Sequence, residues 1–295
     1  MQALAAEVWR LAPQTVNVDT TVGEIAWTFA PPRNPSDAPL KHRLWYDDNH
    51  VIGWGVIFPP TKIKVTADRM ELSKAGLVWQ MHPDQSEVLD DILDWFAAET
   101  PGAARQTSLR SADAAARRRI EAHGFTHDAA APWDLMNMRD LQEIEEPALP
   151  AGYRLTTMQE IGDIALRVAV HRAAWEPSKL TEEKYAAAMS TWPYRADLDF
   201  VVEAPDGMLA SSALGWYDEA NRTGEFEPVG THPDHRRLGL ARAVMLFGMQ
   251  RFRAAGATHA LVGCRGDDDY PIPKLVYESI GFRELSRDLP FVSQP

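Results

Sequence analysis

The spacing of apolar residues changes between residues 231 and 243, and the change separates a predicted strand from a predicted helix. The two-residue alternation of a half-buried strand runs through Glu225-Phe226-Glu227-Pro228-Val229-Gly230-Thr231. Residues 243–252 instead have the wider apolar spacing of an amphipathic helix. Strand, loop and helix therefore follow one another directly.

Similar patterns elsewhere predict strands that alternate with helices, the order of an α/β fold. In the second half, the predicted strands are residues 153–156, 199–203, 209–217, 225–231 and 259–264, followed by terminal strands. The predicted helices are residues 159–174, 181–192 and 243–252, with a last helix that ends near Ile280. In the first half, residues 44–46 and 51–58 are predicted strands rich in aromatic residues. We expect those aromatic side chains to be core, with a few lining an interdomain cleft.

A stretch rich in acidic residues, proline and glycine interrupts these patterns at residues 140–152. Such a composition is typical of a linker. The chain has 295 residues, more than one hydrophobic core usually supports. We therefore predict two lobes, residues 1–140 and residues 150–295.

The two halves share a faint internal repeat. His-Pro-Asp follows a predicted strand at His82 and again at His232. Gly-Phe occurs 42 positions after the first landmark, at Gly124, and 49 positions after the second, at Gly281, as a shortened loop would produce. This similarity predicts that the lobes are related.

The first lobe lacks the chemistry of the second. After its His-Pro-Asp it has the acidic run 85–94, which would repel a phosphate, where the second lobe has arginines and a glycine. Ile120 stands in the place of Tyr277 and cannot donate a proton. We expect the first lobe to be a scaffold.

The loop before the helix at residues 243–252 has the features of an anion site. The first N–H groups of a helix have no intrahelical acceptor, and the helix dipole adds partial positive charge there. A bound diphosphate satisfies both. The candidate contacts are Arg236, Arg237, Leu238, Gly239, Leu240 and Ala241.

Arg236, Gly239 and Ala241 resemble the acetyl-CoA signature of the GNAT superfamily of N-acetyltransferases: Arg or Gln, two residues, Gly, one residue, then Gly or Ala. Tyr277, which precedes a Gly-Phe pair, resembles the end of that family's domain. One departure is Tyr270, which stands where many members have Asn. The resemblance implies acetyl-CoA as cosubstrate. It also implies two GNAT-like α/β (α+β) lobes, each a mixed, mostly antiparallel sheet flanked by helices.

Pro228 predicts a bulge or a local opening in its strand, because proline cannot donate a hydrogen bond to a neighbouring strand. The resembled family separates its two middle strands at this place to admit the acyl-pantetheine arm. The resemblance implies that backbone groups of Val229, Gly230 and Thr231 bind that arm. Their N–H groups would polarise the acetyl carbonyl, as an oxyanion hole does.

Three side chains are candidates for proton transfer. Glu225 and Glu227 lie on one face of their strand, so either is a candidate base for the amine. We favour Glu227, which adjoins the expected bulge. Tyr277 is the candidate acid for the leaving thiolate. The structural alternatives are two exposed strand carboxylates and a packed helix tyrosine.

Other reactive side chains receive structural roles. We expect His232 and His235 to cap or pack the phosphate loop, and Cys264 to be a buried thiol rather than a nucleophile. No cysteine pair or helical histidine pair has the spacing of a metal site, so no metal is expected.

The formal net charge of −12 disfavours nucleic acid as a partner. Acidic residues at positions 197, 199, 218, 219 and 267–269 favour an amine that carries positive charge. A single cysteine, a start unlike a signal peptide and the lack of a membrane-spanning apolar run lead us to expect a cytoplasmic protein that binds no membrane. Hydrophobic residues of the first lobe are also compatible with a homodimer face.

Two functions follow from these residues. The first is an N-acetyltransferase that moves an acetyl group from acetyl-CoA to a small-molecule primary amine by direct attack. The alternative is a catalytically silent acyl-CoA-binding or sensing module, which would have no need for Tyr277.

Overall fold

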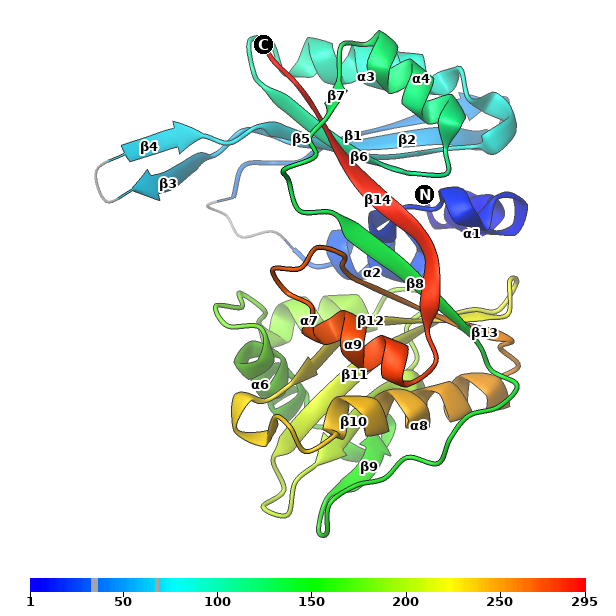
Figure 1. Ribbon diagram of the computed structural model, residues 1–295, viewed down its shortest axis with the longest axis vertical. Coiled ribbons are helices and arrows are strands. Elements are labelled where there is room, and N and C mark those ends of the chain that lie inside the picture. The colour runs from blue at the N-terminus through cyan, green and yellow to red at the C-terminus, as the bar shows by residue number, and fades with distance from the viewer. Residues whose placement is uncertain (33–36, 67–68) are drawn as a thin grey trace.

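A computed structural model describes residues 1–32, 37–66 and 69–295. One mixed sheet of 12 strands runs through the molecule in the order β1-β2-β5-β6-β14-β8-β13-β12-β11-β10-β9, with β7 beside β14 (Figure 1). The strands are β1 (Lys41–Asp47), β2 (His50–Phe58), β5 (Ala75–Met81), β6 (Arg105–Arg110), β7 (Thr126–His127), β8 (Asp134–Asp140), β9 (Arg154–Thr157), β10 (Asp199–Glu203), β11 (Leu209–Asp218), β12 (Thr223–Thr231), β13 (His259–Arg265) and β14 (Arg283–Ser293). Strands β3 (Lys62–Thr66) and β4 (Arg69–Leu72) form a separate hairpin.

Helices cover both faces of this sheet. In the second lobe α8 packs against β10, β11 and β12, where Phe200, Phe226 and Phe252 form a buried aromatic cluster. Helix α6 contacts β11 and β12 as well. The helices are α1 (Gln2–Leu11), α2 (Val22–Phe29), α3 (Val88–Glu99), α4 (Ala114–Ala122), α5 (Met158–Ile161), α6 (Ile164–Ala174), α7 (Glu182–Met189), α8 (Leu240–Ala254) and α9 (Ile272–Ser279).

The two proposed lobes exchange their last strands. Strand β8, from the first half, pairs along its whole length with β13 of the second half. Strand β14, at the end of the chain, pairs with β6 of the first half and crosses between the lobes in Figure 1. Its Phe291 is fully buried in the core of the first lobe. Each lobe is therefore completed by the other half of the chain.

The amino-terminal segment also packs on the second lobe. Helix α2 contacts β11 and β12, and its Ala26 is buried with Leu214 and Trp216. The Asn221 side chain donates a hydrogen bond of 2.8 Å to the carbonyl of Ala6. Residues 1–29 therefore belong structurally to both lobes.

The internal repeat is confirmed at its landmarks. The imidazoles of His82 and His232 each accept a backbone hydrogen bond of 3.2 Å from the residue two positions later. The glycine of the Gly-Phe pair has a left-handed backbone in both lobes, with φ of 80° at Gly124 and 85° at Gly281. In the first lobe the backbone N–H of Phe125 closes the turn by donating to the carbonyl of Ile120 at 3.2 Å. In the second lobe the N–H of Phe282 donates in the same way to the carbonyl of Tyr277 at 3.1 Å.

Several predicted boundaries were wrong. The helix predicted over residues 159–174 is broken, because Gly162 adopts a left-handed backbone and Asp163 caps a new helix. The predicted terminal strands are one long strand, β14. Leu44 and Tyr46 are exposed rather than core, since β1 is an edge strand, whereas Trp54 of β2 is fully buried as predicted.

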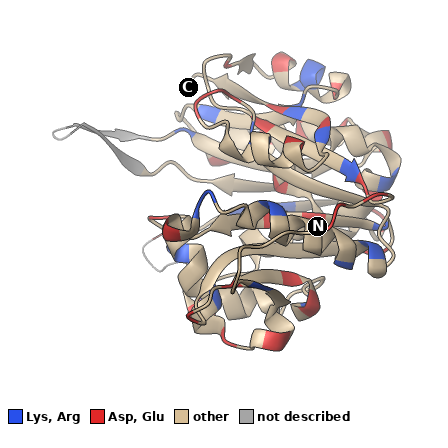
Figure 2. Ribbon diagram, turned by 60° about the horizontal axis from the view of Figure 1, so that its bottom comes forward, with Lys and Arg blue, Asp and Glu red and all other residues tan. Residues whose placement is uncertain are grey.

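Charged residues are distributed over both lobes. Figure 2 shows acidic and basic positions interspersed along the ribbon. None of the helices in the part of the chain that the structure describes has the length and apolar character needed to cross a bilayer.

The strand exchange predicts that a carboxyl-terminal residue stabilises the amino-terminal lobe. Phe291→Ala should lower the free energy of unfolding by about 3–5 kcal/mol, because it removes a fully buried ring. Urea denaturation followed by circular dichroism measures this. Leu275→Ala, at a position that is 60% exposed, is the control. Equal stability of the two variants would contradict the exchange.

Candidate active site

The central strands separate at the predicted place. Pairing of β12 with β11 shifts between Ala213 and Gly215, so that Glu227 and Pro228 oppose a single residue. The parallel ladder between β12 and β13 ends at Phe226 and Val262, although both strands continue. The bulge and the opening predicted from Pro228 are confirmed.

Residues 229–231 line this opening. They pair with β11 on one side only, so alternate backbone groups face the gap where β13 has separated. Ser211 fixes this segment by donating a hydrogen bond of 3.0 Å to the carbonyl of Gly230. Gly230 is required by close packing, because a Cβ there would lie 2.7 Å from that of Ala174.

The loop after β12 exposes a row of unbonded N–H groups. Helix α8 begins at Leu240 without a side-chain cap, and its first turn closes from Ala243 to Gly239 at 3.0 Å. In the described ranges of the chain, the N–H groups of residues 237–242 have no protein acceptor. Gly239 has a left-handed backbone, with φ of 76°, and Arg237 has φ of 62°. This geometry presents the donors of an anion site.

Histidines hold this loop in shape, as predicted. The His232 imidazole accepts from the backbone N–H of Asp234. His235 Nδ1 lies 2.8 Å from the hydroxyl of Tyr153, at the start of the second lobe. Tyr153 was not predicted as part of the site, since 82 residues separate it from His235.

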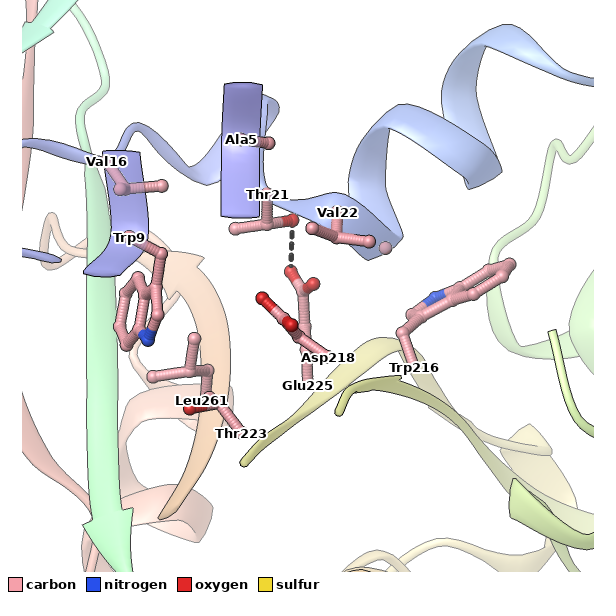
Figure 3. A pocket seen from close by; sticks show the side chains of 11 residues that line it. Ala5, Trp9, Val16, Thr21, Val22, Trp216, Asp218, Thr223, Glu225 and Leu261 are labelled. Atoms are coloured by element: carbon pink, nitrogen blue, oxygen red, sulfur yellow. Dashed lines mark hydrogen bonds between the residues drawn. The ribbon is translucent and has the colours of Figure 1, made fainter. Parts of the chain in front are cut away.

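Two carboxyl groups stand below the opening, on one strand. The Glu225 carboxylate is buried and accepts a hydrogen bond of 2.6 Å from the Thr21 hydroxyl (Figure 3). Burial raises the pKa of Glu225 to about 7, although the bond from Thr21 opposes this. Burial, and then the charge of Glu225, raises the pKa of Glu227 to about 8.

The amino-terminal segment contributes residues that the sequence did not reveal. Glu24 of α2 has a pKa raised well above its usual value by burial and then by the charge of Glu227. Burial also raises the pKa of Asp19 to about 6, with Asp134 of β8 as the next cause. No local pattern marks these residues, because only the packing of α2 on the second lobe brings them to the opening.

Tyr277 reaches the same place from α9. Its side chain is buried, and burial followed by the charges of Glu227 and Cys264 raises its pKa. Cys264 is half-buried beside the Asn137 amide, and burial raises the pKa of its thiol to about 11. It is therefore protonated at neutral pH, as expected of a structural thiol.

Comparison with known proteins places this site in a family. Residues 166–282 match the model described as the acetyltransferase (GNAT) family. This part of the chain belongs to the GNAT family.

Relatives and solved structures extend the GNAT similarity beyond that segment. A mycothiol acetyltransferase from Kineococcus radiotolerans is 26% identical to this chain, over 60% of this chain and 62% of that protein. A mycothiol acetyltransferase from Streptomyces griseus is also 26% identical, over 59% of this chain and 61% of that protein. A tandem GNAT protein from the clavulanic acid biosynthesis pathway superposes with a TM-score of 0.64 at 14% identity, covering 99% of this chain and 94% of that one. A GNAT-family acetyltransferase from Colwellia psychrerythraea superposes with a TM-score of 0.58 at 12% identity, covering 100% of this chain and 98% of that one. The structural likeness shows a fold of two GNAT lobes.

The acidic residues predicted to attract a cationic amine are largely paired within the GNAT domain. Asp199 is fully buried and bonds Arg167 Nε at 2.9 Å. Asp267 forms two hydrogen bonds of 2.5 and 2.7 Å with Arg265. Arg195 bonds Asp197 in the same way. Each of these three carboxylates has an arginine partner, so the attraction of a cationic amine to them stays a prediction.

Burial of Glu225 predicts a pH-dependent effect on stability. Its folded pKa of about 7 exceeds the ordinary value of 4.5, so the folded state loses stability as the pH rises between these values. Glu225→Gln keeps an amide oxygen that can accept the hydrogen bond from Thr21. Because glutamine does not ionise, the variant should not lose this stability as the pH rises. The variant should gain about 2–3 kcal/mol relative to the parent between pH 4.5 and pH 8. Thermal unfolding across that range measures the gain; Glu219→Gln, at an exposed position, is the control. A constant difference would contradict the assigned burial.

Proposed function

We propose that this chain is an acetyl-CoA-dependent N-acetyltransferase whose acceptor is a primary amine of a small molecule. One observation carries the proposal: the unbonded N–H groups of residues 237–242 follow a strand opening that begins at Glu227, with Glu225 two residues before it on the same strand and Tyr277 near enough for the charge of Glu227 to act on it. The curated relatives are matched over only 62% and 61% of their length, so their named activity supports the reaction class alone.

The cosubstrate would bind at the loop and enter the opening. The N–H groups from Arg237 to Ala241 and the exposed guanidinium of Arg236 would hold the diphosphate. GNAT proteins use acetyl-CoA, and the gap after Phe226 has the place expected for its pantetheine arm. Backbone N–H groups of residues 229–231 would polarise the acetyl carbonyl.

Transfer then needs two proton movements. The amine nitrogen attacks the thioester carbon, the carbon–sulfur bond breaks, and an amide and a free thiol result. Glu225 and Glu227 would accept the proton that the amine loses, directly or through water. The charge of Glu225 adds to the cost of ionising Glu227, which is the carboxyl group at the bulge. Tyr277 would protonate the thiolate and recover its proton from the site.

Tyr277→Phe tests whether the site is catalytic. Loss of the hydroxyl should lower kcat by about 10- to 100-fold and change the acetyl-CoA Kd less than twofold, because the ring remains packed. Thiol release with a panel of amines and calorimetric titration measure the two quantities. Tyr270→Phe, whose ring is 51% exposed, is the control. Binding without turnover in the parent would instead favour a silent acyl-CoA-binding module.

The carboxyl pair predicts how the rate depends on pH. The base must be ionised, so kcat/KM should rise with pH through an apparent pKa between about 7 and 8. Glu227→Gln should lower kcat by about 10²-fold or more and displace or abolish that limb. Glu203→Gln, at the far end of β10, serves as the control. A rate that is flat from pH 6 to 9 in the parent would contradict the assignment.

A further inference from the structure

A cleft of about 640 Å³ lies over one face of the first lobe's sheet. Four paired residues form a row across its floor, one from each of β2, β5, β6 and β14. Phe58 pairs with Gly76, Gly76 pairs with Gln106, and Gln106 pairs with Val292. Paired residues point to the same face of a sheet, so this row is a continuous surface made from both ends of the chain.

One end of this cleft lies at Asp19, in the amino-terminal segment that packs beside the strand opening. Asp19 lines the cleft, and its charge contributes to the raised pKa of Glu227. Its neighbour Val18 packs on Gly263, where a Cβ would lie 3.3 Å from the valine methyl group. Gly263 is the first residue of β13 beyond its ladder with β12. An amine beside Asp19 would therefore stand close to the opening.

Another part of the cleft rim, at Pro132, lies near the end of β13. Pro132 lines the cleft, and the next residue, Trp133, covers the end of β13, where a Cβ on Gly266 would clash with the indole at 2.1 Å. The cleft therefore lies over the sheet of the first lobe, with Pro132 at its rim beside the residue that covers the end of β13.

The described part of the lining carries little charge. Among the lining residues whose side chains the structure describes, the ionisable ones are Asp19, Asp128 and Lys74, and the others are neutral. Phe58, Val292 and several prolines and alanines make much of it apolar. A polycation would need more carboxylates to replace its water, and a phosphorylated molecule would need more cations. The volume lies in the range of small-molecule sites.

We propose that this cleft is the acceptor site, and that the acceptor is a monoamine on a largely apolar, uncharged body, with its nitrogen at Asp19. The proposal rests on the function proposed above and adds the class of substrate. It also gives the first lobe a role beyond that of a scaffold, because its sheet supplies the floor of the site.

Gly76 offers a direct way to block the cleft. Its backbone is not left-handed, and a Cβ would meet Phe58 at 3.5 Å and Gln106 at 3.9 Å, which are ordinary contact distances. A leucine there should fold and should project into the cleft. Ala98→Leu adds the same side chain at an exposed position of α3 and is the matched control.

Calorimetric titration in the presence of coenzyme A tests the proposal without requiring turnover. The probes are 4-phenylbutylamine and spermidine. The parent and Ala98→Leu should bind 4-phenylbutylamine at least tenfold more tightly than spermidine. Gly76→Leu should weaken 4-phenylbutylamine binding at least tenfold and leave the acetyl-CoA Kd and the Tm unchanged. Val292→Asp, which adds a carboxylate to the floor, should shift the preference toward spermidine at least fivefold.

Two results would overturn the acceptor site and leave the acetyltransferase proposal standing: tighter binding of spermidine by the parent, or equal binding of 4-phenylbutylamine by the parent and Gly76→Leu. Failure of the parent to bind acetyl-CoA at all would instead overturn the proposed function.

Discussion

Separation of β12 from β13 after Phe226 is the constraint on which the rest of the site depends. A parallel ladder would otherwise satisfy the backbone groups of residues 229–231 and close the sheet. That ladder ends at Phe226, and the bulge at Glu227 and Pro228 follows directly. Polar backbone groups are left inside the molecule, where water and a ligand compete for them. At the same gap the charge of Glu227 acts on Tyr277, and the charge of Glu225 acts on Glu227.

The gap is stable because both lobes support its edges. Strand β8 of the first half holds the far side of β13, and the amino-terminal segment covers the glutamate face through the bond from Thr21 to Glu225. The second lobe therefore lacks a complete sheet of its own. This arrangement explains how a lobe without a phosphate loop remains indispensable to one that has it.

Sequence patterns predicted those parts of the site that are formed by residues close together in the chain. The strand, the phosphate loop and its helix follow from residues 225–252, and the opening follows from Pro228, because each depends on neighbours in the chain. The strand exchange did not follow: β8 was not among the predicted strands, and the pattern of a terminal strand does not indicate which strand it will pair with. Asp19 and Glu24 were missed for the same reason: their place is decided by packing between distant segments. The pairing of Asp199 and Asp267 with arginines also did not follow from the sequence, because a charge count does not locate the partners of a carboxylate.

The most direct test is an amide NMR titration of the ¹⁵N-labelled, deuterated protein with acetyl-CoA. We expect saturable shifts centred on the N–H groups of residues 237–242 and 229–231, and no shifts in the loop after His82. Absence of shifts at residues 237–242, or shifts confined to the first lobe, would contradict the claim that the unbonded amides and the strand opening form one cosubstrate site.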